Sequence, residues 1–500
     1  MTSDSRTFFG KHPELTLLLA FALLATTILT FISPDSFLNG LHHRVDSAWF
    51  FMCGKAWMNG LIPYVDFSDS KGPILWLIYG FGYLLSHTDY LGVFWISCLW
   101  YALTFYFTYK TARVFLPETR KAVFCTILMV LAYFNPWFHN EIRAEDFSLL
   151  FMVISLYEMC RLVWGDPTRA DRRYFVLGCC FVSLLLIKFN IAAMQAVLIL
   201  GALCFAQDAA TLWKRILWCI LGGCAAALPF VICFIIQGNL TAFVTEYFLR
   251  TWETASISYV HQEADIFSRL LLYCREWYCV LAEPEIGSWL LLLVLGGLLF
   301  SRRLTRHRYL ILLVSLAVFA LNIRHHILYY FTISSPFLLF LLISCIKDFP
   351  LRRKGIVYPV ALAAVGLCVT SHVLLVNSGT FLNRNTPERG GYQKVADAIA
   401  QTPHATIVNA FNHETGVGTP GEALPAGKYW ARQNGSTPEM DKEHVSLILS
   451  GKADYIYVRE PSVALEHGLS IEDIEAAGYH ILCVGGEYED SVLLTKNHRE

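Results

Sequence analysis

Residues 216–236 read ILWCILGGCAAALPFVICFII, a run that contains no charged side chain. A helix of about 20 apolar residues is long enough to cross the roughly 30 Å hydrocarbon core of a bilayer. Over all 500 residues, 55% are hydrophobic and only 16% are charged, whereas soluble domains carry about 25% charged residues. Because the charge deficit is concentrated in runs of this kind, the sequence predicts an α-helical polytopic membrane protein.

Ten further stretches have the same apolar character, and we expect 11–13 transmembrane helices in total. The stretches are 15–32, 90–109, 121–138, 147–164, 174–188, 190–206, 287–301, 309–323, 327–346 and 356–377. The first is longer than a signal-peptide core and no small-residue cleavage site follows it, so we interpret it as an uncleaved span. The apolar segment Gly72–Ser86 would break the alternation of loops described next, and we interpret it as a short interfacial or re-entrant helix.

Basic residues predict the orientation of the chain, because loops rich in Lys and Arg stay in the cytoplasm. Every second loop is basic, with clusters at 110–121, 161–173, 214–215, 302–308 and 347–354. This pattern predicts that the N-terminus is cytoplasmic and that the part after residue 377 lies on the outside of the membrane. No basic block is long enough to suggest nucleic acid as a partner, and we expect none.

The C-terminal part, residues 380–500, has the composition of a soluble domain, and we separate it from a membrane domain at 1–379. Alternating apolar residues predict strands at 405–410, 454–459, 480–484 and 491–495, and a helix at 471–477. The pattern is typical of a small α/β domain. It has no metal-ligand spacing, phosphate loop or nucleophile elbow, so we expect it to cover the external face of the membrane domain.

The first external loop, residues 34–71, has too many aromatic residues for a simple connection. Trp49, Phe50 and Trp57 recur near helical spacing, and we interpret this part as an amphipathic helix with its aromatic face in lipid. Asp46 stands at its start, where a carboxylate caps free N–H groups, so a cap and a functional role both remain open. Lys71 at the end of the loop is either an interfacial anchor or a functional cation.

Three other polar clusters lie at predicted external helix ends. Arg143 precedes Glu145 and Asp146, which either cap a helix or serve the function, because such charges at a membrane boundary are costly unless used. Lys188 is an anion-facing or, slightly preferred, a snorkelling lysine at a hairpin tip. Arg324 and His325 could equally grip a phosphate or form an interfacial cluster.

These positions resemble the GT-C superfamily of membrane glycosyltransferases over about residues 10–380, in particular the bacterial aminoarabinose, protein O-mannosyl and rhizobial core-polysaccharide transferases. The resemblance rests on Asp46, then Gly60-Leu61-Ile62-Pro63-Tyr64-Val65-Asp66 for G-x-x-P-Y-x-D, then Lys71-Gly72-Pro73, with Glu145-Asp146 as a second match. The chain departs from the family in having Gly72 where proline is common. It also has Ser47 where a second acidic residue is common.

The resemblance implies an inverting transfer of a sugar from a polyprenyl-phosphate donor to an external lipid, glycan or protein acceptor. It implies Asp46 as the general base and Glu145 and Asp146 as a second acidic site. The donor phosphate would be held by Lys71, Arg324, Lys188 and His325, and Tyr64, Asp66 and Arg143 belong to the same external loops. No cofactor is certain, and we do not favour a divalent metal, because Ser47 replaces the second acidic residue.

A polytopic transporter or flippase of envelope precursors is the alternative, since polar residues inside membrane domains often mark a pathway. Transporters tend to show internal repeats and broken helices near the bilayer midplane. Here the polar residues gather at external helix ends and no repeat is visible, which favours an enzyme.

Overall fold

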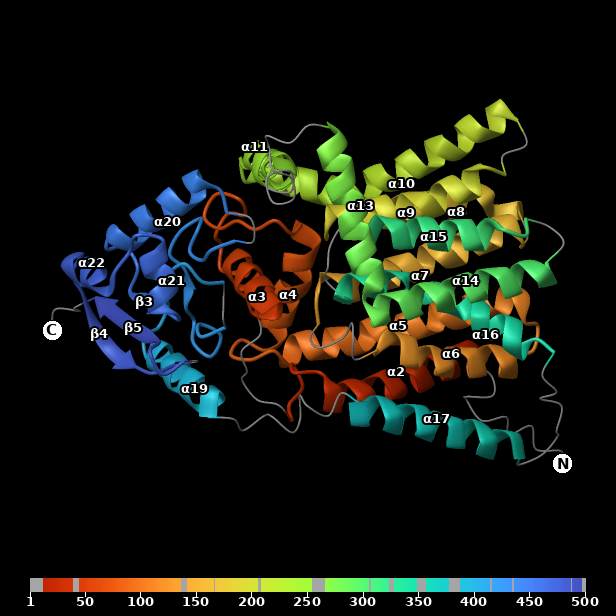
Figure 1. Cartoon of the computed structure of the whole chain (residues 1–500), viewed down its shortest axis with the longest axis horizontal. Helices are drawn as coiled ribbons and strands as arrows, with labels where there is room; N and C mark the ends of the chain where they lie inside the picture. Colours follow the sequence, from red (N-terminus) through yellow and green to blue (C-terminus); the bar gives the residue numbers. More distant parts are fainter. Residues whose placement is uncertain are drawn as a thin grey trace, which may run out of the picture.

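The computed structural model describes residues 12–38, 45–135, 142–165, 167–205, 208–253, 266–304, 307–322, 328–348, 357–376, 387–413, 416–433, 436–486 and 488–496. A bundle of long helices forms one part and a small α/β domain forms the other (Figure 1). The described chain is thus α-helical with a small C-terminal sheet, as predicted.

Each of the eleven predicted apolar stretches is helical. They are α2 (Pro13–Ile32), α5 (Leu91–Phe115), α6 (Thr119–Tyr133), α7 (Ala144–Val163), α8 (Ala170–Leu185), α9 (Phe189–Leu203), α10 (Ala209–Ile236), α14 (Pro284–Arg303), α15 (Leu310–Asn322), η3 (Leu328–Leu338) continued by α16 (Leu339–Ile346), and α17 (Val357–Val376). Among the described residues, five of these segments are long and apolar enough to cross a membrane, and others are shorter apolar helices. The protein is integral to the membrane, and the count of 11–13 spans stays a prediction.

Two short helices separate the bundle from the C-terminal domain (Figure 1). Helix α3 (Val45–Met58) is followed by a turn at Gly60, whose φ of +89° is a left-handed conformation that suits glycine. Helix α4 (Pro73–Leu85) has 13 residues. It packs so closely on α3 that a Cβ at Gly54 would lie 2.4 Å from the backbone nitrogen of Gly80.

The prediction that the aromatic face of α3 lies in lipid is wrong. Trp49 is 5% exposed and Phe50 is 2% exposed, and the Trp49 ring lies 5.3 Å from the ring of Trp430 in the C-terminal domain. The aromatic side chains are buried because protein, and not lipid, covers this face of the helix.

The stretch between α10 and α14 contains helices of its own. They are α11 (Leu240–Phe243), the π-helical turn η2 (Val244–Arg250) and α13 (Ile266–Ala282), which packs on α14. A further short turn, η1 (Pro167–Arg169), precedes α8.

The C-terminal domain, called the tail below, has a five-stranded sheet with the order β2-β1-β3-β5-β4. Its elements are α19 (Pro387–Ala400), β1 (Thr406–Asn409), β2 (Leu424–Pro425), α20 (Pro438–Leu449), β3 (Tyr455–Val458), α21 (Pro461–Glu466), α22 (Ile471–Ala476), β4 (Tyr479–Val484) and β5 (Val492–Lys496). Strands β2, β1 and β3 are parallel, while β3, β5 and β4 are antiparallel. The four predicted strands and the helix at 471–477 are confirmed, whereas β2, α20 and α21 were not predicted.

The tail is joined to α3 through a buried lysine. The Lys55 ammonium group is fully buried and donates to the carbonyl oxygens of Gly418 at 3.0 Å and Gly421 at 2.5 Å. Tyr90, which precedes α5, forms a 3.0 Å hydrogen bond with Thr419. The tail therefore covers the end of the bundle where α3 and α4 lie (Figure 1).

Candidate active site

Asp46 lies in the first turn of α3, and its carboxylate is held by a residue from another part of the chain. Its Oδ2 is 3.2 Å from the Nε of Arg143, and the two side chains are 24% and 13% exposed. A carboxylate in the first turn of a helix also complements the helix dipole. Its position thus fits the cap interpretation and leaves room for a functional role.

Asp46 lines a small polar cavity between the bundle and the tail. The cavity is lined by Asp46, Trp49, Phe50, Asp69, Lys71, His413 and Gln433. The first three come from α3, the next two from the loop before α4, and the last two from the tail. The predicted base and the predicted phosphate-binding lysine therefore share one cavity.

Lys71 and Lys188 are brought together by a backbone contact. The N–H of Gly72 donates to the carbonyl oxygen of Ile187 at 2.9 Å, so the residue after Lys71 meets the residue before Lys188. A Cβ at position 72 would lie only 2.1 Å from the carbonyl oxygen of Leu186. The departure from proline at Gly72 is thus explained, because this approach needs both the N–H and the missing side chain.

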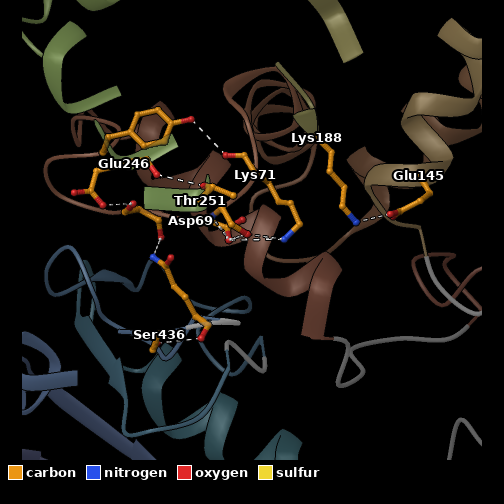
Figure 2. A network of polar contacts seen from close by, with 11 residues as sticks. Asp69, Lys71, Glu145, Lys188, Glu246, Thr251 and Ser436 are labelled. Atoms are coloured by element: carbon orange, nitrogen blue, oxygen red, sulfur yellow. Dashed lines mark hydrogen bonds and ion pairs between the residues drawn. The ribbon is translucent and has the colours of Figure 1, made fainter. Parts of the chain in front are cut away.

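Lys188 forms a buried ion pair. Its Nζ lies 2.5 Å from Oε1 of Glu145 (Figure 2). The same nitrogen lies 3.8 Å from the centre of the Tyr330 ring. The residue is only 8% exposed. The preferred interpretation of Lys188 as a snorkelling lysine is therefore wrong, since a snorkelling ammonium group reaches water.

Asp146 caps α7, as the cap interpretation predicts. Its Oδ2 accepts the backbone N–H of Arg143 at 2.9 Å, and its Oδ1 accepts the Tyr101 hydroxyl at 2.5 Å. The Arg143 guanidinium stacks 3.9 Å above the Tyr329 ring, and Lys188 lies 6.0 Å from the same ring. Tyr329 thus links the Asp46–Arg143 pair to the Glu145–Lys188 pair.

The loop between α3 and α4 is held by its own polar groups. Tyr64 is buried with a φ of +64°, and its hydroxyl lies 3.4 Å from the carbonyl oxygen of Lys71. Asp66 accepts the N–H of Ile62 at 2.7 Å. These two residues shape the loop that presents Lys71. Arg324 and His325 lie outside the described residues.

Comparisons with known proteins match this architecture. A family model described as dolichyl-phosphate-mannose-protein mannosyltransferase matches residues 70–236. The structure of ArnT from Cupriavidus metallidurans bound to undecaprenyl phosphate is similar over 98% of both chains, with a TM-score of 0.58 and 12% identity. Its apo state gives a TM-score of 0.57 at 13% identity, over 97% of this chain and 98% of that one.

The chain has the GT-C fold. A variant of the arabinofuranosyltransferase AftD from Mycobacteria also shares it, with a TM-score of 0.51 and 11% identity over 96% of this chain and 41% of AftD. No curated protein matches the chain significantly in sequence. The chain is thus similar over residues 70–236 to a family of mannosyltransferases, and it is similar in fold to ArnT and AftD.

Several residues in the cavity of this GT-C protein were not predicted from sequence. Asp69 belongs to the acidic segment just before Lys71, and this closeness in sequence could have marked it as a site residue. His413 and Gln433 come from the tail, where no local pattern marks them. Within the described ranges, no group of three or more His, Cys, Asp or Glu side chains is placed to hold a metal ion.

Proposed function

We propose that this protein is an inverting glycosyltransferase that takes a sugar from a polyprenyl-phosphate carrier, with Asp46 as the general base. The observation that carries the proposal is the shared cavity of Asp46 and Lys71 at the α3–α4 end of the bundle. A base and a cation are the two groups that this reaction needs. The related ArnT structure is described as bound to undecaprenyl phosphate, which supports a lipid-phosphate donor here.

The chemistry follows from a direct displacement. The acceptor hydroxyl oxygen attacks the anomeric carbon while the bond from that carbon to the phosphate oxygen breaks, and Asp46 takes the hydroxyl proton. A positioned base of this kind contributes roughly 10²–10⁴-fold to the rate. Arg143 holds the Asp46 carboxylate in place for the attack.

The departing phosphate gains negative charge, which a cation in a poorly solvated site stabilises strongly. Lys71 is the main candidate, because its nearest carboxylate oxygen, on Asp69, is 4.0 Å away. Lys188 already has Glu145 at 2.5 Å, so a phosphate would compete with that carboxylate. We therefore propose that Lys188 contributes less than Lys71 to phosphate binding, because Glu145 already pairs with it. Arg324 and His325 remain proposed as further phosphate-binding residues.

We further propose that the protein consists of a membrane domain at 1–379 and a tail at 380–500. The tail and the cavity would lie on the periplasmic side of the inner membrane. The acceptor would be a lipid, a glycan or a protein on that side. The transporter alternative gains no support from the cavity, which lies at one end of the bundle.

The test replaces Asp46 by Asn in a deletion strain and measures envelope glycans by mass spectrometry. We expect the glycan restored by the wild type to fall by 10²–10⁴-fold, while the purified variant still binds undecaprenyl phosphate. Asp397→Asn, on the exposed side of α19, is the matched control and should restore the glycan fully. Undiminished glycan with Asp46→Asn would remove Asp46 as the base.

A further inference from the structure

Two residues that line the cavity carry buried polar atoms without a hydrogen-bond partner among the described residues. The Nε1 of Trp49 and the Oδ2 of Asp69 find no hydrogen-bond partner within the part of the chain that the structure describes. Trp49 is 5% exposed and Asp69 is 6% exposed. A buried donor or acceptor without a partner costs roughly 1–3 kcal/mol. One donor and one acceptor at the same cavity point to a ligand that offers both.

The tail adds two polar side chains whose orientations are fixed. Gln433 donates from Nε2 to the carbonyl oxygen of Ser68 at 2.7 Å. The His413 ring lies edge-on to Trp49, with ring centres 6.3 Å apart. Burial lowers the pKa of His413 below its ordinary value, and the ring already hydrogen-bonds to the backbone of Arg432. The neutral ring therefore keeps its second nitrogen as an acceptor.

A buried carboxylate holds the tail in this position. Glu246 in η2 is 6% exposed and pairs with Lys428 at 2.6 Å and Arg250 at 3.5 Å. It also accepts hydrogen bonds from Tyr429 at 3.2 Å and Ser68 at 3.5 Å, and Figure 2 shows it in one network with Asp69 and Lys71. Together with Lys55, this network fixes the tail against the loop that carries Asp69, as a preorganised site requires.

We propose that the tail completes the donor site, with Trp49, Asp69, His413 and Gln433 forming a subsite for the hydroxyl groups of the transferred sugar. The inference rests on the proposed function. Lys71 lies 4.0 Å from Asp69, and the phosphate that Lys71 would bind is bonded to the sugar on one side and to the polyprenyl chain on the other. The unpaired Trp49 donor and Asp69 acceptor suit the hydroxyl groups of the sugar, whereas the hydrocarbon chain offers no hydrogen-bonding group. The rings of Trp49 and Phe50 cover the apolar face of the sugar.

The charge of the cavity also selects the class of sugar. Asp46 and Asp69 are two carboxylates at the cavity, and their charges are balanced by Arg143, which pairs with Asp46, and by Lys71. The donor phosphate adds a negative charge that Lys71 would bind. A sugar with its own carboxylate would add a further negative charge for which the lining residues offer no second cation, which is strongly unfavourable. The subsite accepts neutral, hydroxyl-rich sugars and rejects uronic acids.

The test measures the binding of three kinds of lipid to the full-length protein in nanodiscs. They are undecaprenyl phosphate, a panel of undecaprenyl-phosphate hexoses (glucose, galactose and mannose) and undecaprenyl-phosphate glucuronic acid. For the wild type, at least one hexose should raise affinity about tenfold or more over undecaprenyl phosphate, while glucuronic acid should not raise it. The variants Trp49→Phe and Gln433→Ala should each lose about five- to tenfold of the hexose gain and keep their affinity for undecaprenyl phosphate.

The controls separate failure of the subsite from failure of the proposed function. Gln401→Ala, exposed at the end of α19, is the control and should keep the hexose gain. If Gln433→Ala loosens the tail, Trp49→Phe still tests the subsite, because it keeps an aromatic ring and removes only the N–H donor. A wild type that does not bind undecaprenyl phosphate contradicts the proposed function itself. If that lipid binds but no hexose adds affinity, or if both variants keep the gain, the subsite is wrong and the enzyme proposal stands. Tighter binding of glucuronic acid overturns the charge selection alone.

Discussion

At the residue scale, Asp46 combines a local and a tertiary role. Its place in the first turn of α3 is favourable for a carboxylate, and Arg143 fixes its direction from the start of α7. A carboxylate is sufficient as the base if the proton leaves late, because the phosphate is already a good leaving group.

The Glu145–Lys188 pair gives a prediction that separates stability from function. Lys188→Met leaves the Glu145 carboxylate, 3% exposed, without its ammonium partner. Breaking a buried pair in this way costs about 3–5 kcal/mol, and we expect thermal unfolding in detergent to show it. The double variant Glu145→Gln/Lys188→Met should recover most of that stability.

Donor binding by the double variant then tests the role of Lys188. A stable double variant that binds undecaprenyl phosphate more weakly than the wild type supports a phosphate contact by Lys188. A stable double variant with unchanged affinity limits Lys188 to a structural role.

Gly72 gives a second prediction at this scale. Gly72→Ala places a Cβ 2.1 Å from the carbonyl oxygen of Leu186, a backbone atom that cannot rotate away. Overpacking of this kind costs about 1–3 kcal/mol, and we expect a lower unfolding temperature and weaker sugar transfer because Lys71 shifts. Gly366→Ala in α17, where a Cβ meets nothing within 4 Å, is the control and should be neutral. Equal stability of the two variants would contradict the close contact.

At the element scale, α3 is the junction of the molecule. One side packs on α4 through Gly54 and Gly80, and another side meets Trp430 of the tail. The short helices that carry Asp46 and follow Lys71 are thereby buried between two larger bodies. Their positions depend on the tail as much as on the bundle.

Lys55→Met tests this dependence. Methionine has a similar shape but cannot donate to Gly418 and Gly421, so two buried carbonyl groups lose a charged donor, at a cost of about 1.5–3 kcal/mol. We expect faster hydrogen exchange in residues 416–425 and reduced transfer, with the exchange of α14 and α15 unchanged. Lys394→Met, exposed on α19, should alter neither. If hydrogen exchange in Lys55→Met is as slow as in the wild type, the tail is held by other contacts.

At the scale of the whole molecule, the tail and the basic helix ends lie at opposite ends of the bundle. The C-terminal ends of α14 and α16 point away from the tail (Figure 1). Arg303 pairs with Asp348 there, and Lys121 donates to the carbonyl oxygen of Lys347 at 2.7 Å. Since basic loops are retained in the cytoplasm, this end is the expected cytoplasmic face.

The orientation predicts the behaviour of reporter fusions. Green fluorescent protein fused after residue 500 should be dark, and alkaline phosphatase at the same position should be active, because that end would be periplasmic. A fusion after residue 348, at the basic end, should give the opposite result and serves as the internal control. A fluorescent C-terminal fusion would contradict the predicted topology and place the cavity in the cytoplasm.

The sequence by itself determined what depends on local pattern. Apolar runs of spanning length identified the helices, alternation identified four of the five strands of the tail, and the stretch from Asp46 to Pro73 indicated the family. Each of these signals lies within a few tens of residues, because helices and strands repeat over short distances. The strand β2 escaped because two residues, Leu424 and Pro425, are too few to show an alternation.

Only the tertiary structure decided which side chains share a cavity. The lipid-facing assignment of α3 failed because an aromatic helix face looks the same in sequence whether lipid or a distant tail covers it. Lys188 was mistaken for a snorkelling residue for the same reason, since Glu145 comes from a different helix. Trp49, Asp69, His413 and Gln433 meet through packing between segments far apart in the chain, and no local periodicity records such contacts.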